Sequence, residues 1–212
     1  WDFNPTPTEL ISLTAFYKLI KNPISRIEVA SAGGYLSYEN IADKATVAGV
    51  EVEVRKNLFV RPLSSAANGM NKLSFGLNGS YIYTNAKMPL ATVTTGSQLE
   101  GAAPWIANFD LSHNFTKGNH SFINTLVLNY VSDKIYTIGT QGYQDIMEQG
   151  MMTLDFVSQA KLNKYVSLTL KARNLLNPSY KLSRKANESG EKVVLSDYKK
   201  GINISLGVSC TF

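Results

Sequence analysis

Strict alternation of apolar and polar residues constrains this chain more than any other feature of its sequence. The pattern is clearest in residues 201–212. One side of this segment carries Ile202, Ile204, Leu206, Val208, Cys210 and Phe212. The other side carries Asn203, Ser205, Gly207, Ser209 and Thr211. A period of two residues is typical of a β-strand whose faces meet different surroundings, so the segment is predicted to be such a strand.

The same period recurs along the whole chain. In residues 46–58, for example, Val52 and Val54 alternate with Glu51 and Glu53. The predicted strands cover residues 9–20, 46–58, 71–85, 104–116, 120–136, 150–162, 165–176 and 201–212. Because no linker divides the chain, we expect one all-β, antiparallel unit.

The connections between these strands differ in length in an ordered way. Residues 117–119 and 163–164 are very short connections. The long connections are 21–45, 86–103, 137–149 and 177–199. Outer-membrane barrels have short periplasmic turns and long extracellular loops. The chain is therefore predicted to be part of an antiparallel transmembrane β-barrel, with its C-terminus on the periplasmic side.

Two of the long connections differ in character. In the first, residues 25–29 and 34–38 flank a turn signal at 31–34, which predicts a hairpin beyond the membrane. Residues 177–199 are more polar and are predicted to be a solvated loop. At the other end of the chain, residues 1–3 are expected to be the tail of a preceding strand, followed by its turn at 4–7.

Aromatic residues gather near the predicted strand ends. They are Tyr17, Phe59, Tyr81, Tyr83, Trp105, Phe115, Tyr130, Tyr136, Tyr165 and Phe212. Amphipathic rings favour the headgroup level of a bilayer, where outer-membrane barrels carry two aromatic girdles. A Tyr-rich core of a soluble β-sandwich is the alternative explanation of the rings alone.

Composition excludes several other classes of protein. Cys210 is the only cysteine, which excludes an internal disulfide and a cysteine-based zinc site. The net charge of +5 comes from dispersed lysines and arginines, so a nucleic-acid-binding surface is not expected. No apolar run is long enough for a transmembrane helix. The first residue is Trp1, so we expect the chain to be processed or truncated at this end.

The sequence offers no constellation of residues for catalysis. His113 and His120 flank a predicted short turn without cysteines or clustered carboxylates beside them, so they are not expected to bind a metal. Nucleophile elbows, phosphate loops and dinucleotide fingerprints do not occur. Neither an enzyme activity nor a cofactor is predicted.

Three short motifs resemble the C-terminal barrel portion of the TonB-dependent receptors of Gram-negative bacteria. Residues 173–180 (RNLLNPSY) look like the Asn-Leu motif of the penultimate strand in these receptors. Residues 38–54 (YENIADKATVAGVEVEV) are similar to their Gly-Val-Glu strand. The run 198–212 (YKKGINISLGVSCTF) resembles their closing strand with its terminal Phe.

The resemblance implies a barrel of about 22 strands, of which residues 1–212 would supply roughly eight at the C-terminal end. It implies a plug domain inside that barrel and a segment that engages the TonB complex, neither of which is visible in this sequence. Other implied partners are outer-membrane lipid and the barrel-assembly machinery, for which Phe212 would be part of the signal. The implied function is TonB-driven import of a scarce nutrient, such as a metal chelate, a vitamin or a glycan.

Charged residues on the polar sides of the strands are expected to face the barrel lumen. They are Glu51, Glu53, Arg55, Asp110, Asp155, Lys171 and Arg173. They suit a substrate path or a contact with the plug, but a wet, charged wall explains most of them, because the interiors of such barrels are polar. No residue is therefore assigned to substrate binding.

Two other architectures are compatible with the alternation. The first is a complete eight-stranded membrane barrel with a structural or adhesive role, whose interior would be filled with side chains. Small residues such as Gly49, Gly76 and Ser112 would leave this interior poorly filled, which speaks against this architecture. The second is a soluble ligand-binding barrel or sandwich, which would expose the charged face of residues 51–55 to water.

Overall fold

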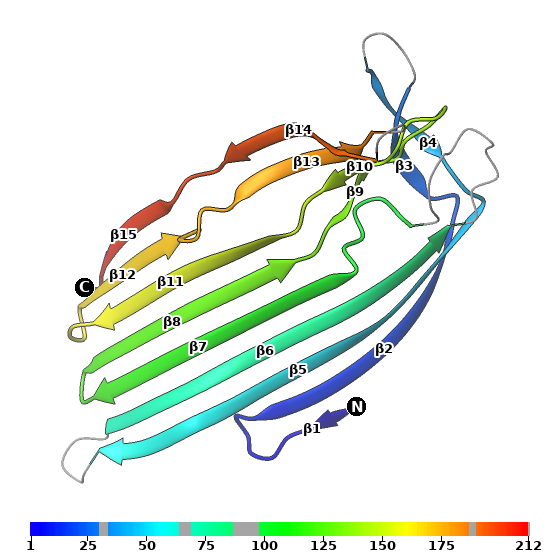
Figure 1. Cartoon of the computed structure of the whole chain (residues 1–212). Helices are drawn as coiled ribbons and strands as arrows, with labels where there is room; N and C mark the ends of the chain where they lie inside the picture. Colours follow the sequence, from blue (N-terminus) through cyan, green and yellow to red (C-terminus); the bar gives the residue numbers. More distant parts are fainter. Residues whose placement is uncertain (30–33, 64–68, 87–97, 187–189, 212) are drawn as a thin grey trace.

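A nine-stranded antiparallel sheet forms the body of the molecule (Figure 1). In spatial order its strands are β1 (Asp2–Phe3), β2 (Leu10–Lys21), β5 (Lys44–Leu63), β6 (Gly69–Ala86), β7 (Trp105–Lys117), β8 (His120–Val131), β11 (Met151–Lys161), β12 (Val166–Arg173) and β15 (Asn203–Cys210). The computed structural model describes residues 1–29, 34–63, 69–86, 98–186 and 190–211. All eight strands predicted from the alternation belong to this sheet, and the predicted tail of a preceding strand is β1.

The predicted strand 120–136 is interrupted at two residues, and the sequence interpretation as one continuous strand is wrong, because its last three residues belong to a separate strand, β9. The interruption falls at Ser132 and Asp133, whose side chains accept hydrogen bonds from the backbones of neighbouring strands. Trp105 N donates to Ser132 Oγ at 3.0 Å, and Gly150 N donates to Asp133 Oδ1 at 2.6 Å. Because these side chains take up donors that a sheet ladder would use, the regular ladder of β8 ends here.

A β-bulge changes the alternation near the end of β5. The register shifts between Asn57 and Phe59, so Phe59 pairs with Leu73. Leu58 is the unpaired residue of this bulge, which reverses the faces beyond it, so the regular alternation of β5 ends at Asn57.

The connections divide the sheet into two ends. At the turn end, Lys117 pairs with His120 across a two-residue turn, in which Gly118 has a φ of 58°. At the same end, Asn163 Oδ1 accepts hydrogen bonds from the backbone of Tyr165 and Val166, at 2.8 and 2.9 Å. The opposite end, called the loop end, carries the long connections (Figure 1).

The loop end has sheets of its own. A four-stranded loop-end sheet has the order β14 (Lys192–Lys199), β13 (Ser179–Lys185), β10 (Ile146–Glu148) and β9 (Lys134–Thr137). The predicted solvated loop at 177–199 is thus wrong, because most of it forms the hairpin β13–β14. The segment is rich in charged residues, but it also contains the run of Val193, Val194 and Leu195, which favours a β-strand. The predicted hairpin in 21–45 is confirmed as β3 (Ile24–Glu28) and β4 (Leu36–Asn40), although most of its turn lies outside the described residues.

The buried apolar core of the described chain lies at the loop end. Its members come from β3, β5, β6, β9 and the segments beside them: Ile27, Ile41, Ala42, Ala45, Ala86, Leu99, Ile135 and Ile138. Strand β3 also joins the end of β9 through a parallel bridge between Ile27 and Ile138. The long connections therefore pack on one another and on the top of the sheet, and this packing holds them in place.

Two adjacent register rows in the middle of the large sheet show the contrast between its faces. One register row is entirely polar and consists of Asp2, Ser12, Glu53, Asn78, Asn108, Asn129 and Thr153. The adjacent row is entirely apolar and consists of Phe3, Ile11, Val54, Leu77, Phe109, Leu128 and Leu154. Since successive residues point to opposite faces, these rows define a polar face and an apolar face.

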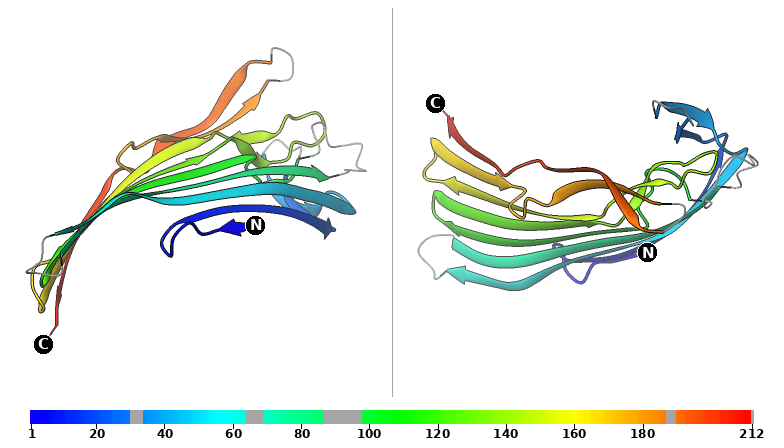
Figure 2. Two further views of the ribbon diagram at one scale, coloured as in Figure 1. Left: turned by 90° about the horizontal axis from the view of Figure 1, so that it is seen from below. Right: turned by 45° about the horizontal axis from the view of Figure 1, so that its top comes forward.

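The sheet is curved and consists of a single layer (Figure 2). In the described residues no helix or second sheet covers the apolar face, and Leu206 and Val208 are 71% and 63% exposed. A soluble sandwich would bury that face. The strands also stay open, with β1 and β15 as edges, so they do not form a complete eight-stranded barrel.

Candidate functional site: the polar face and the loop end

The predicted inward-facing residues all lie on strands of the large sheet. Glu51, Glu53 and Arg55 alternate along the polar face of β5. Arg55 Nε lies 2.6 Å from Glu53 Oε1, and because the arginine side chain is 66% exposed, this ion pair adds little to stability. Asp110 of β7 lies in the same register row as Arg55, with Gly76 between them.

Gly76 leaves room for a shallow depression on the polar face. The Asp110 carboxylate lies over this glycine, where a Cβ atom would collide with it. The resulting pocket of about 300 Å³ is lined in part by Glu53, Arg55, Asn78 and Asp110. This depression exists because Gly76 has no side chain to fill it.

A second group lies where β11, β12 and β15 approach the loop end. Lys171 pairs with Ser205, and Arg173 pairs with Asn203. Asp155 and Arg173 line a pocket of about 390 Å³. The structure therefore divides the seven predicted residues into a group on β5 and β7 and a group on β11 and β12.

The motif at 173–180 forms hydrogen bonds that fix the turn after β12 beside this second group, a role that the sequence did not reveal. Asn174 and Asn177 adopt positive φ angles of 58° and 44°, which asparagine tolerates better than most residues. Asn174 Nδ2 donates to Gly201 O at 2.7 Å, and Gly201 N donates to Asn177 Oδ1 at 3.1 Å. Asn174 N also donates to Asp155 Oδ1 at 2.8 Å. The turn after β12 is thereby tied to the start of β15.

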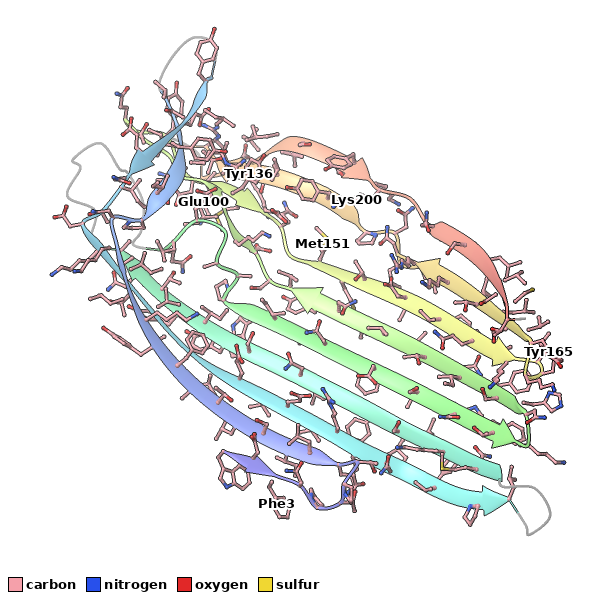
Figure 3. All side chains as sticks on the ribbon, turned by 180° about the vertical axis from the view of Figure 1, so that it is seen from behind. Phe3, Glu100, Tyr136, Met151, Tyr165 and Lys200 are labelled. Atoms are coloured by element: carbon pink, nitrogen blue, oxygen red, sulfur yellow. The ribbon has the colours of Figure 1, made fainter. Side chains whose placement is uncertain are left out.

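Two arginine–glutamate pairs hold the loop-end segments together. Arg26 Nη2 lies 3.1 Å from Glu100 Oε1, and the guanidinium lies over the Tyr136 ring, 4.1 Å from its centroid. Glu28 Oε2 lies 2.6 Å from Arg184 Nη2. These contacts connect β3 to the segment before β7, to β9 and to β13. Glu100 and Tyr136 are labelled in this region in Figure 3.

Two pKa shifts follow from these surroundings. Burial lowers the pKa of Arg26, but the hydrogen bond to Glu100 and the charges of Tyr136 and Glu100 outweigh it, so the net pKa is raised. Burial, with the charge of Glu148 and a hydrogen bond to it, raises the pKa of Tyr180 to about 12. The Tyr180 phenol therefore stays protonated at neutral pH and donates to Glu148 Oε2 at 3.3 Å.

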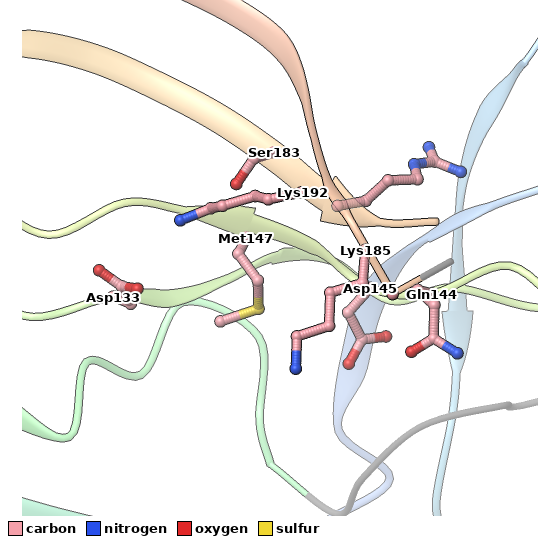
Figure 4. Close-up of a pocket in the computed structure, with 9 residues that line it drawn as sticks. Asp133, Gln144, Asp145, Met147, Ser183, Lys185 and Lys192 are labelled. Atoms are coloured by element: carbon pink, nitrogen blue, oxygen red, sulfur yellow. The ribbon is translucent and has the colours of Figure 1, made fainter. Parts of the chain in front are cut away.

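A pocket of about 390 Å³ opens beside the loop-end sheet (Figure 4). Lys185 and Lys192 line it and are direct register partners on β13 and β14. Its two acids each accept a backbone hydrogen bond, Asp133 from Gly150 N and Asp145 from Gly139 N. The sequence did not predict this pocket, because most of its walls come from connections that were expected to be loops.

The histidines lie at the turn end. His113 Nε2 lies 2.8 Å from Asn71 Oδ1, and His120 closes the short turn. Among the described residues, no three His, Cys, Asp or Glu side chains are grouped so that they could hold a metal ion.

Most of the predicted aromatic girdle follows the edges of the apolar face. The rings of Tyr81 and Trp105 lie in tilted contact near the loop end with centroids 4.5 Å apart, and those of Phe115 and Phe122 are 6.5 Å apart near the turn end. Tyr165 is at the turn end (Figure 3). Tyr136 is an exception, because it lies in the loop-end sheet against Arg26. Phe212 lies outside the described residues.

The apolar run on this face moves toward the turn end from strand to strand. The register partners of Ile204 on β15, followed across the sheet, lead to Lys56 on β5. Lys56 is on the same face as Val54 and lies two residues nearer the turn end. Between β5 and β15 the centre of the apolar run moves about seven residues along the strands, which is roughly 24 Å. Over the same interval the sheet extends about six strand spacings across the strands, which is roughly 29 Å. This slope of about 40° equals the usual tilt of strands in a transmembrane barrel.

A slanted apolar band, a polar opposite face and aromatic edges together define the wall of an antiparallel β-barrel of the outer-membrane type. The model of the family described as TonB dependent receptor-like, beta-barrel matches residues 1–175. The chain belongs to this family, whose members are transport receptors of the outer membrane. The match stops before most of the 173–180 motif and before the closing run.

Comparison with curated proteins and comparison with solved structures gave no match. The described part of the chain contains no helix long and apolar enough to cross a membrane.

Proposed function

We propose that the chain forms part of the barrel of a TonB-dependent importer, which takes up a scarce nutrient such as a metal chelate, a vitamin or a glycan. The observation that carries this proposal is the polar row across seven strands, backed by an apolar row next to it. Such a wall separates lipid from a watery passage. In this proposal, the seven charged residues of the polar face line the lumen.

The proposal includes a division of the receptor. Residues 1–212 would be the C-terminal part of the barrel, while further strands and the plug domain would come from other sequence of the same protein. The open edges β1 and β15 support this division, because unpaired backbone groups in lipid are costly until another strand pairs with them. The TonB complex would act through the plug, and the import would require no chemical change of the cargo.

The pocket in Figure 4 is our candidate for the first contact with the cargo. It lies at the loop end, which we place outside the cell. Lys185 and Lys192 have no ion-pair partner among the described residues, so the pocket suits a ligand that carries an anionic group.

Cysteine labelling tests the lumen and the energy source together. In the full-length receptor, cysteines at Glu53, Asn78 and Ser205 should react with a water-soluble maleimide, because they replace polar-face residues. On intact cells, this reaction should depend on TonB, since only a displaced plug exposes the lumen. The apolar-face positions Val52, Leu77 and Leu206 are the matched controls and should resist the reagent. Equal labelling of both sets would refute the sidedness, and labelling that ignores TonB would refute the coupling.

Epitope tags test the orientation. Tags in the connections 86–103, 137–149 and 177–199 should bind antibody on intact cells, because long loops of such barrels are extracellular. In the last of these, the tag belongs between β13 and β14, where it leaves both strands intact. A tag at Gly118 should bind antibody only after permeabilisation. The reverse accessibility would place the C-terminus outside the cell.

A further inference from the structure

Two lysines face each other at the loop end of β2 and β5. Lys21 and Lys44 are direct register partners, and both are exposed. No described carboxylate lies within ion-pair distance of either ammonium group. Like charges directly opposite on adjacent strands destabilise a sheet, so this pairing calls for a counter-ion.

The two lysines belong to the apolar face. On β2, Lys21 follows Leu19 and Tyr17 at steps of two residues, so all three side chains share that face. On β5, Lys44 precedes Ala48 by four residues, and Ala48 pairs with both Tyr17 and Tyr83. The lysine pair therefore lies just beyond the end of the apolar run on both strands.

This position sets the lysines at a defined depth. Tyr17 and Tyr83 are 69% and 50% exposed on the apolar face, as expected for rings at the bilayer interface. Four residues along a strand tilted by about 40° raise the lysine backbone about 10 Å above the tyrosine backbone. A lysine side chain bends its ammonium group back toward the interface, so both charges reach the headgroup layer.

We propose that Lys21 and Lys44 form a binding site for the phosphate group of an anionic lipid in the leaflet at the loop end. The pair is continuous with the lipid-facing surface and points away from the polar face, which favours a lipid headgroup over a free anion. Two adjacent ammonium groups offer several donors to the oxygens of one phosphate. This inference rests on the proposed function only for the identity of the leaflet, which is the outer one if the loop end lies outside the cell.

The test uses the full-length receptor in nanodiscs of phosphatidylcholine with a minor fraction of bisphosphorylated lipid A. Native mass spectrometry then counts the lipid A molecules that remain bound. Wild-type receptor should retain one at this site, and K21Q/K44Q should lower that occupancy about tenfold by removing the charge-assisted bonds. K21R/K44R should retain it. The matched control K18Q/K72Q removes the same charge from the polar face and should bind as wild type does.

Dephosphorylated lipid A is the second arm of the experiment. Wild-type receptor should retain dephosphorylated lipid A only weakly, at about the level at which K21Q/K44Q retains bisphosphorylated lipid A. Equal retention of both lipids by wild type, or unchanged retention by K21Q/K44Q, would overturn the proposal. Heat-modifiability on gels confirms that each variant is folded. Because lipid retention is measured without TonB and in either leaflet, its failure is distinct from a failure of the transport proposal.

Discussion

Arginine in place of Phe109 is expected to lower the free energy of unfolding of the full-length receptor in lipid by about 2–4 kcal/mol. Phe109 lies in the middle of the apolar row, between Leu77 and Leu128. A guanidinium there meets hydrocarbon at the depth where the penalty is largest. The substitution also removes the ring contact with Phe75, whose centroid is 6.2 Å away.

The neighbouring position provides the control for this substitution. Asn108 lies one residue away on the polar face, between Asn78 and Asn129. Asn108→Arg adds the same charge to the same strand and should change the free energy of unfolding by far less. Denaturant unfolding in lipid vesicles measures both variants. Equal losses for the two would mean that the faces do not meet different solvents.

Deleting residues 201–212 should remove the receptor from the outer membrane. Strand β15 pairs with β12 along all of Val166–Arg173, so the deletion exposes the whole edge of β12 to lipid. Each unpaired backbone group in the hydrocarbon costs several kcal/mol, and a barrel with such an edge does not close. Outer-membrane abundance and heat-modifiability of the full-length variant report the outcome. Normal membrane levels without this strand would contradict the proposed closure.

Deleting Phe212 alone separates assembly from stability. This residue lies outside the described part of the chain, and its removal takes away one ring and few ladder bonds. Intrinsic stability in detergent should therefore stay close to that of wild type, while abundance in cells should fall if the terminal aromatic is read during assembly. Unchanged abundance would remove Phe212 from the assembly signal.

Sequence alone was sufficient to predict the strands of the large sheet and most of its faces. The alternation of Val52, Glu53 and Val54, for example, specifies a half-exposed strand without any knowledge of its neighbours. This works because side chains on a strand alternate by local geometry. The same reasoning does not extend past Asn57 on β5, where the bulge at Leu58 reverses the faces and leaves no local signal.

The tertiary structure decided what depends on residues far apart in the chain. The hairpin β13–β14 was hidden, because its polar residues look like a loop until β10 pairs with it. The pairing of Lys21 with Lys44 and of Glu28 with Arg184 likewise requires the register of strands and loops that are distant in sequence. Alternation determines which face each side chain takes, whereas the neighbour it meets there is set by long-range backbone pairing, and that pairing alone brings these charges together.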